Sequence, residues 1–260
     1  MNDNKDGKKQ EKRREALNEI RDHITKFGFH TYVVTGGGDP HYGYTIGLTE
    51  SLGAEFILAG AYFYRLREVS NVIKSIIAKL SSSVAWESLS VAADPWGTFS
   101  FRHVHTSWAT ALMLGAFDYY RGKNIEAYQI VPDETHWTID VPNLSQPPGP
   151  NQAPGWRCLT EEWTYPVPRD SVALTDLNVL RGGWITEVMR WEEDQWEIFS
   201  GSGQEIPESE RRVIPLGVLL SADNSLLPAV DLRVETGFWR DKEEPEWHSW
   251  GKAKEPMSPG

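Results

Sequence analysis

The residues best suited to chemistry lie beside one glycine-rich turn near the start of the chain. Asp39, His41 and Tyr44 follow three consecutive glycines, Gly36-Gly37-Gly38. Glycine accepts positive φ at little steric cost, so this stretch predicts a sharp turn that leads into a strand. As a nucleotide signal the glycines are weak, because the GxGxxG spacing and the Lys-Ser/Thr of a P-loop are both missing. The pattern predicts polar side chains beside a turn and names no substrate.

A second polar group, Asp133 and His136, follows a strand expected at 127–131. A carboxylate and an imidazole at a strand end can act as general base and general acid. One hypothesis is therefore an enzyme whose pocket in the first domain joins Asp133 and His136 to Asp39, His41 and Tyr44. The alternative is that Asp133 only shapes the turn after Pro132, since aspartate favours turns whatever the function.

Two histidines, His103 and His105, are spaced two residues apart and share a face if the segment is extended. With His41 and Asp133 they would supply the three or four ligands that zinc or iron accepts. No spacing forces these four residues together, and two ordinary strand histidines explain the pattern as well. A metal-dependent enzyme stays an alternative; otherwise we expect no cofactor.

Composition narrows the compartment and the class of function. Cys158 is the single cysteine, which excludes an intramolecular disulfide and fits a reducing compartment. No apolar run approaches the roughly 18 residues that a membrane span needs, so we expect a cytoplasmic protein without a membrane partner. Ser200 does not lie in a G-x-S-x-G elbow, which disfavours a serine hydrolase.

The negative charge is concentrated in the C-terminal part of the chain. Residues 1–150 carry 15 Lys/Arg and 17 Asp/Glu, whereas residues 151–260 carry 11 and 20, a net charge of −9. Such a segment repels nucleic acid, which requires clustered Lys and Arg. A basic protein partner fits this charge better, although acidic surfaces also favour solubility alone.

Aromatic residues gather in the same acidic part, where eight of the twelve tryptophans follow residue 150. Runs at 185–190 and 195–200 flank a polar turn and predict a β-hairpin. Side chains alternate faces along a hairpin, so some tryptophans must point outward unless a second layer covers them. The candidate partner-binding residues are Trp184, Trp191, Glu192, Glu193, Asp194 and Trp196. Packing in the core is the alternative role for these tryptophans.

The predicted fold class is α+β, with two domains that each contain a mixed or antiparallel sheet and flanking helices. Five prolines between residues 142 and 154 predict a linker, because proline lacks the amide donor of helices and sheets. The expected organisation is a charged helix (1–26), a first domain (27–142), a Pro-rich linker (143–156), an acidic Trp-rich domain (157–245) and a polar tail (246–260).

The expected elements follow from periodicity. An apolar stripe at helical spacing predicts a helix over 64–80, and strands are expected at 99–105 and 237–240. Residues 214–220 fit a short helix or a buried strand. The other predicted elements are strands at 31–34, 42–48, 55–59 and 127–131 and a helix over 107–120.

The first domain, from Phe29 to Leu144, resembles an uncharacterised bacterial family known as domain of unknown function 4262. The residues that carry the resemblance are Asp39-Pro40, Tyr44-Thr45-Ile46-Gly47-Leu48, Glu55-Phe56-Ile57-Leu58-Ala59-Gly60 and Tyr128-Gln129-Ile130-Val131-Pro132-Asp133. The resemblance implies a bacterial α+β domain without an assigned activity. The chain departs from the pattern at Thr135-His136-Trp137, where the family has a glycine-phenylalanine-proline-tryptophan-like run.

The second domain, over about residues 170–241, is similar to domain of unknown function 2185, which resembles immunity proteins of bacterial polymorphic toxin systems. The similarity rests on scattered positions: Asp194, Trp196, Phe199-Ser200-Gly201, Leu219 to Asp223, Leu226-Leu227-Pro228, Phe238 and Arg240. It implies a non-enzymatic protein that masks a basic toxin domain. The alternatives are an enzyme in the first domain and a sensor of a small ligand.

Overall fold

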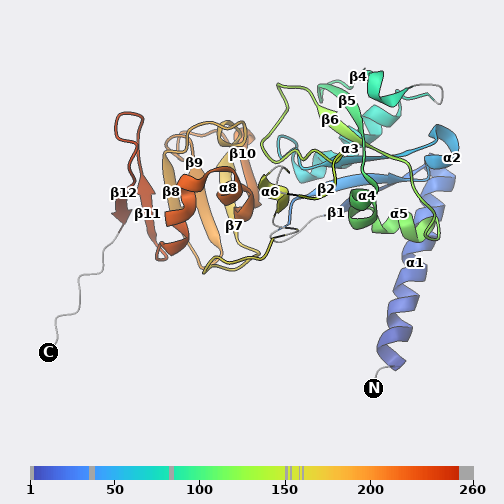
Figure 1. Cartoon of the computed structure of the whole chain (residues 1–260), viewed down its shortest axis with the longest axis horizontal. Coiled ribbons are helices and arrows are strands. Elements are labelled where there is room, and N and C mark those ends of the chain that lie inside the picture. The colour runs from blue at the N-terminus through green and yellow to red at the C-terminus, as the bar shows by residue number, and fades with distance from the viewer. Residues whose placement is uncertain are drawn as a thin grey trace.

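The computed structural model describes residues 3–34, 39–81, 85–149, 152, 154–157, 159 and 161–251 (Figure 1). The Gly36-Gly37-Gly38 turn, Cys158 and residues 252–260 of the predicted tail lie outside the described residues. None of the described helices has the length and apolar character to cross a bilayer.

The first domain is built on a six-stranded sheet of order β1-β2-β3-β6-β5-β4. Its strands are β1 (His30–Val34), β2 (Tyr42–Ile46), β3 (Glu55–Ala59), β4 (Ser90–Ala92), β5 (Thr98–His103) and β6 (Ala127–Pro132). β3 and β6 run parallel, and the other neighbouring pairs are antiparallel. Every residue of β3 is buried, because helices cover both faces of the sheet at its centre.

Two helical layers enclose this sheet. The helical elements are α1 (Asp3–Phe27), α2 (Thr49–Leu52), α3 (Leu66–Ile77), η1 (Trp86–Ser88), α4 (Thr106–Leu112) and α5 (Leu114–Tyr119). Val69, Val72 and Ile73 of α3 join the core on one face, as the apolar stripe predicts. Ile20 of α1 and Trp108 of α4 belong to the core on the opposite face. The N-terminal half of α1 projects away from the body (Figure 1).

The second domain contains another six-stranded sheet, of order β10-β7-β9-β8-β11-β12. Its strands are β7 (Val172–Asp176), β8 (Glu187–Arg190), β9 (Gln195–Phe199), β10 (Arg211–Pro215), β11 (Thr236–Trp239) and β12 (His248–Gly251). Its helical elements are α6 (Pro154–Arg157), α7 (Leu177–Leu180), η2 (Glu208–Glu210), α8 (Leu216–Ala222) and η3 (Asn224–Asp231). The core lies between one face of the sheet and residues of α7, α8 and η3. The two sheets confirm the predicted α+β class.

Several local predictions are confirmed and others need correction. β8 and β9 form the predicted hairpin, and residues 214–220 hold the end of β10 and most of α8, so each of the two readings is partly right. The strand expected over 99–105 ends at His103, and the helix expected over 107–120 is broken at Met113. β4, β7, β12 and most of β10 were not predicted.

The Pro-rich segment (143–156) packs closely against the first domain where it is described. Leu144 and Trp156 are fully buried. The Leu144 amide donates to Gln129 Oε1, and the Trp156 indole donates to the carbonyl of Asp140. Proline removes a donor but keeps its carbonyl, and Pro142 accepts a hydrogen bond from Gln129. The expectation of a linker with few buried contacts is therefore wrong for these residues.

The junction between the two sheets is held by buried hydrogen bonds. Arg212 of β10 donates from Nε and Nη2 to the carbonyls of Tyr62 and Phe63, which follow β3. The Ile139 amide donates to the Leu180 carbonyl across the same junction. The two domains therefore form one packed body, in which the sheets lie side by side along the long axis (Figure 1).

Segment 60–63 reaches Arg212 through an unusual backbone. Gly60 and Ala61 both have positive φ, of 67° and 62°. The Asp140 carboxylate accepts a hydrogen bond from the Tyr62 amide and lies so close that a Cβ on Gly60 would be 2.5 Å from the Asp140 carbonyl oxygen. Only glycine fits at position 60, so this close approach fixes where the chain leaves β3.

Replacing Gly60 by alanine tests this constraint. Gly60→Ala combines a left-handed backbone with a clash against buried main chain. Gly53→Ala is the matched control, because Gly53 also has positive φ (81°) but nothing lies within 4 Å of an added Cβ. We expect Gly53→Ala to cost roughly 1–2 kcal/mol in urea unfolding and Gly60→Ala about 2 kcal/mol more. Equal losses in the two variants would contradict the steric argument.

Candidate functional site

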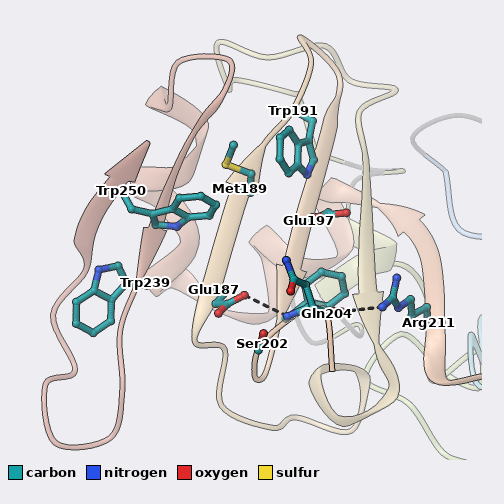
Figure 2. Close-up of a pocket in the computed structure, with 11 residues that line it drawn as sticks. Glu187, Met189, Trp191, Glu197, Ser202, Gln204, Arg211, Trp239 and Trp250 are labelled. Atoms are coloured by element: carbon teal, nitrogen blue, oxygen red, sulfur yellow. Dashed lines mark hydrogen bonds between the residues drawn. The ribbon is translucent and has the colours of Figure 1, made fainter. Parts of the chain in front are cut away.

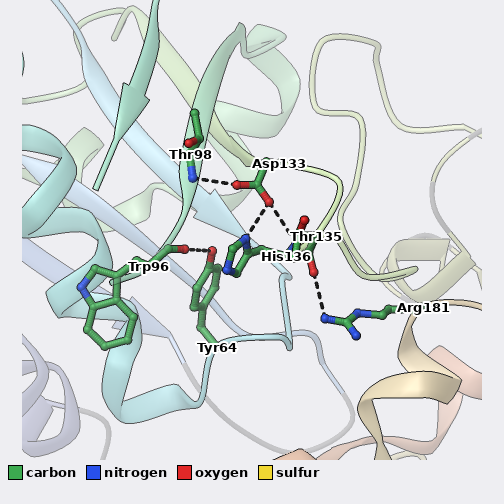
Figure 3. Close-up of polar contacts among 7 residues, drawn as sticks. All are labelled: Tyr64, Trp96, Thr98, Asp133, Thr135, His136 and Arg181. Carbon is green, nitrogen blue, oxygen red and sulfur yellow. Dashed lines mark hydrogen bonds and ion pairs between the residues drawn. The ribbon is translucent and has the colours of Figure 1, made fainter. Parts of the chain in front are cut away.

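Asp133 and His136 form a close pair just after β6, as the sequence indicated (Figure 3). The His136 Nδ1 donates to Asp133 Oδ1 at 2.6 Å, and the His136 amide donates to the same carboxylate at 3.1 Å. The Thr98 amide donates to Asp133 Oδ2 at 2.7 Å. The imidazole stacks on Tyr64, with ring centroids 6.0 Å apart and an interplanar angle of 6°.

These contacts give Asp133 a structural task. Burial alone would raise the pKa of Asp133, but hydrogen bonds from Thr98 and His136 outweigh it and lower that pKa below its ordinary value. Tyr64 donates to the Trp96 carbonyl at 2.6 Å, and Gly97 closes against the His136 ring. The pair thus joins the end of β6 to the start of β5 and shapes the turn that follows Pro132, which supports the turn interpretation.

His41 lies apart from that pair, at the start of β2. Its side chain is 5% exposed and packs on Tyr62, with ring centroids 4.1 Å apart. Within the described part of the chain its Nε2 has no hydrogen-bond partner. Burial lowers the pKa of His41 to about 4, against a smaller opposing effect of the Gly60 backbone, so the imidazole is neutral at pH 7.

Asp39 and Tyr44 do not complete a catalytic group with His41. Asp39 pairs with Arg169 at 3.1 Å. The Tyr44 hydroxyl accepts a hydrogen bond from the Gly115 amide at 3.0 Å, and burial raises the pKa of Tyr44. Tyr44 borders a cavity beneath α1 and α5, whereas Asp39 and His41 border a different one at the domain junction. The candidate catalytic residues Asp39, His41 and Tyr44 therefore do not line one common cavity among those described.

The four residues of the metal hypothesis are not brought together. His103 ends β5 and pairs with Glu126 at 3.1 Å. His105 lies beyond the strand, where its Nδ1 accepts a hydrogen bond from the Ser107 amide and caps α4. The described residues contain no group of three His, Cys, Asp or Glu side chains that could hold a metal ion. β5 ends at His103, so His105 does not belong to the strand.

The candidate partner-binding tryptophans have three different environments. Trp196 is buried in the second core beneath the Arg190 guanidinium, so its predicted binding role is corrected to a core role. Trp184 is half-exposed and stacks on Arg240, whose Cζ lies 4.0 Å from the ring centroid. Trp191 is 46% exposed. At the adjoining turn, Glu192 and Glu193 are exposed, whereas Asp194 is half-buried.

Trp191 lines a concavity of about 790 Å³ on the uncovered face of the second sheet (Figure 2). We call this surface the outer concavity. Its other aromatic walls are Trp239 of β11 and Trp250 of β12, which are 39% and 43% exposed. Glu187 of β8 also lines the concavity, and Glu197 of β9 lies on the side of Trp191 that faces away from Trp239 and Trp250.

Strand register explains why these residues share one face. Glu197 is paired with Met189, and Glu187 with Trp239, so their side chains point to the same side of the sheet. Loop residue Gly203 closes one end of the concavity, because its amide donates to Glu187 Oε2 and its carbonyl accepts from Arg211 (Figure 2). Trp239 and Trp250 were missed from the sequence. The alternation of 236–239 was the available signal for Trp239, but the pairing of β11 with β12 had none.

The outer concavity is lined by charged residues of both signs, Glu187, Glu197 and Arg211. Arg211 is the guanidinium in the lining, and it is held by the carbonyls of Gly203 and Ile206. Glu197 makes no ion pair or hydrogen bond through its side chain within the described residues. The outer concavity therefore combines half-exposed indole rings with an unpaired carboxylate.

Comparison with known proteins identifies only the first domain. Residues 23–137 match the family model described as Domain of unknown function (DUF4262). The first domain therefore carries the predicted DUF4262 resemblance. The match ends at Trp137 and does not reach the outer concavity or the segment similar to domain of unknown function 2185. No curated protein and no solved structure matches the chain.

The DUF4262 motif residues meet around a buried carboxylate, Glu55. Its Oε1 accepts hydrogen bonds from the amides of Gly47, Leu48 and Thr49, and Tyr120 donates to it at 2.5 Å. These bonds occupy Glu55 within the fold, so the motif explains how this part of the first domain is built.

The burial of His41 predicts a pH dependence of folding. Its pKa is about 4 in the folded chain against an ordinary value of 6.5, so the unfolded chain binds the extra proton first. The stability that His41 confers is complete above pH 6.5 and is lost as the pH falls towards 4, by about 3 kcal/mol in all. His41→Phe should lack this loss in urea unfolding, whereas His103→Gln should retain it. Parallel profiles for wild type and His41→Phe would contradict the assignment.

Proposed function

We propose that the protein is a non-enzymatic binding protein whose second domain masks a basic partner protein at the outer concavity. The observation that supports this most is the presence of three half-exposed tryptophans and two carboxylates, Glu187 and Glu197, in the lining of one concavity on an uncovered sheet face. Exposed aromatic clusters of this size are unusual on a surface that contacts only water. Indole rings favour cations above their faces, and carboxylates attract them from a distance.

The charge and shape of the surface favour a Lys/Arg-bearing segment of a protein over other ligands. The residues after 150 carry a net charge of −9, which repels nucleic acid. Tryptophan and tyrosine are typical anchors of protein interfaces, where a few buried aromatics contribute most of the binding energy. A basic toxin domain of a bacterial conflict system is the partner class that the immunity-like similarity implies.

The polar residues of the first domain support a non-enzymatic role, because they make hydrogen bonds within the fold. Asp133 and Glu55 accept hydrogen bonds from main-chain amides, and the His136 imidazole donates to the Asp133 carboxylate. The Tyr44 hydroxyl accepts from the Gly115 amide of α5. The catalytic residues of the enzyme hypothesis thus serve the fold. We infer that the DUF4262 domain acts as the platform on which the second sheet is fixed.

Removing one aromatic wall tests the proposal. The full chain is titrated with a synthetic Lys/Arg-rich peptide by calorimetry, and with the same peptide carrying Gln in place of Lys and Arg. We expect saturable binding of the basic peptide alone. Trp250→Ala should weaken it by about 2 kcal/mol if Trp250 is an anchor. Trp137→Ala is the matched control, because Trp137 is 40% exposed but lies in the first domain. Equal effects of the two variants would sink the proposal.

Charge and anchoring should separate in the kinetics. Glu197→Gln removes a charge with little change of shape, so we expect a slower on-rate and a flatter salt dependence with a nearly unchanged off-rate. Glu134→Gln makes the same charge change on an exposed residue of the first domain and should leave the on-rate nearly unchanged. Stopped-flow fluorescence of the tryptophans measures both rates. If both variants slow binding equally, only the net charge matters and the outer concavity is not the site.

A further inference from the structure

A second cavity, of about 440 Å³, lies at the junction of the two domains. We call it the junction cavity. Its first-domain wall contains His41, Tyr64 and Arg65, and its second-domain wall is the edge strand β10. This volume falls in the range of small-ligand sites, which are mostly apolar with a few placed polar groups. Leu66, Val213 and Pro215 supply such apolar surface.

The charges that line the junction cavity are mostly positive. Arg65, Arg211 and Arg212 border it, and within the described residues none of them forms an ion pair with a carboxylate. Among the described residues of the lining, Asp39 is the only acidic one, and it is paired with Arg169 at the surface. An acidic domain thus presents a cationic recess on this side.

Arg212 makes the lack of a counter-ion costly. It is buried, and its described hydrogen bonds all go to main-chain carbonyls, those of Tyr62, Phe63, Ser209 and Arg211. Burial, and then repulsion from Arg65, lowers the pKa of Arg212, while the carboxylates of Glu68 and Glu210 oppose this with smaller effects. A buried guanidinium that forms no ion pair still carries a desolvation penalty, which an anion in the adjoining cavity would reduce.

Hydrogen-bond donors are also free at this cavity. Arg65 uses Nη2 to reach the Glu208 carbonyl, and no other acceptor of its guanidinium is found among the described residues. The Leu216 amide donates to Ser171 of the neighbouring chain segment, so alternation along β10 leaves the Val213 amide on the free edge. His41 adds a side chain that is 5% exposed and whose Nε2 has no partner within the described part of the chain.

We propose that the junction cavity binds a small molecule with an oxyanion group, phosphate or carboxylate. Arg65 and the Val213 amide bind the oxyanion, the unpartnered Nε2 of the neutral His41 imidazole accepts a hydrogen bond from a hydroxyl group of the molecule, and Tyr64 and Leu66 contact its less polar part. Guanidinium groups pair with planar carboxylates and with phosphates, which is why both classes are included. This site is separate from the outer concavity and does not depend on the proposed function.

Calorimetry on the full chain tests the proposal with pyrophosphate and with citrate as probes. We expect saturable binding of at least one, and the stronger of the two identifies the class. Arg65→Gln should weaken it about tenfold or more, since a charge-assisted hydrogen bond is lost. Arg67→Gln is the matched control, because Arg67 is exposed on the same helix and does not line the cavity.

A second variant, His41→Phe, tests the site without changing the charge of the protein at pH 7, because the His41 imidazole is neutral there. His41→Phe keeps a ring of similar size against Tyr62 but removes both nitrogens, so it should also weaken binding while circular dichroism stays unchanged. Binding of the basic peptide at the outer concavity should be unaffected by Arg65→Gln, which separates the two sites. The absence of saturable binding by both probes, or equal losses in Arg65→Gln and Arg67→Gln, would overturn the proposal.

Discussion

The first domain depends on one buried carboxylate that forms no ion pair with any cation among the described residues. Glu55 is fully buried at the start of β3, and it is satisfied by main-chain amides of the turn after β2 and by the hydroxyl groups of Thr45 and Tyr120. Because an unsatisfied buried charge costs several kcal/mol, the turn, the strand and α5 can only assemble together. This explains why Gly47, Leu48 and Glu55, which carry the DUF4262 resemblance, lie together.

At the domain junction, buried charges are likewise satisfied by main-chain groups. One of these charges, Asp140, belongs to the first domain, and the other, Arg212, belongs to the second. Asp140 holds the Tyr62 amide from one side, and burial raises the pKa of Asp140 to about 6. Arg212 holds the Tyr62 and Phe63 carbonyls from the other side. Each charge is satisfied by the main chain of segment 60–63 and not by the other charge. Directional hydrogen bonds of this kind fix the position of the second sheet against the first, which a proline-rich connection alone would leave free.

Sequence patterns predicted the parts of the structure that local periodicity decides. The apolar stripe of α3 and the alternation around the β8–β9 turn are local, and both elements formed as expected. Whether Trp191 or Trp196 points outward depends on which face α8 covers, and that is a long-range fact. Likewise, His105 left the strand because its side chain caps α4, a competition that two-residue spacing does not reveal. The outer concavity could not be predicted without the register of β11 and β12, and these strands are distant in sequence from the β8–β9 hairpin.

The placement of charge on the second domain shows why net charge alone is a poor guide to its ligands. The edge strand β10 separates two surfaces of opposite character, the outer concavity with Glu187 and Glu197 and the junction cavity with Arg65 and Arg212. Arg211 borders both. Cations and small anions would therefore be sorted to different faces by short-range contacts, while the overall negative charge acts mainly on the rate at which a basic partner approaches. A domain with a charge of −9 can in this way hold an anion site, provided that the site is recessed and its guanidinium groups lack carboxylate partners.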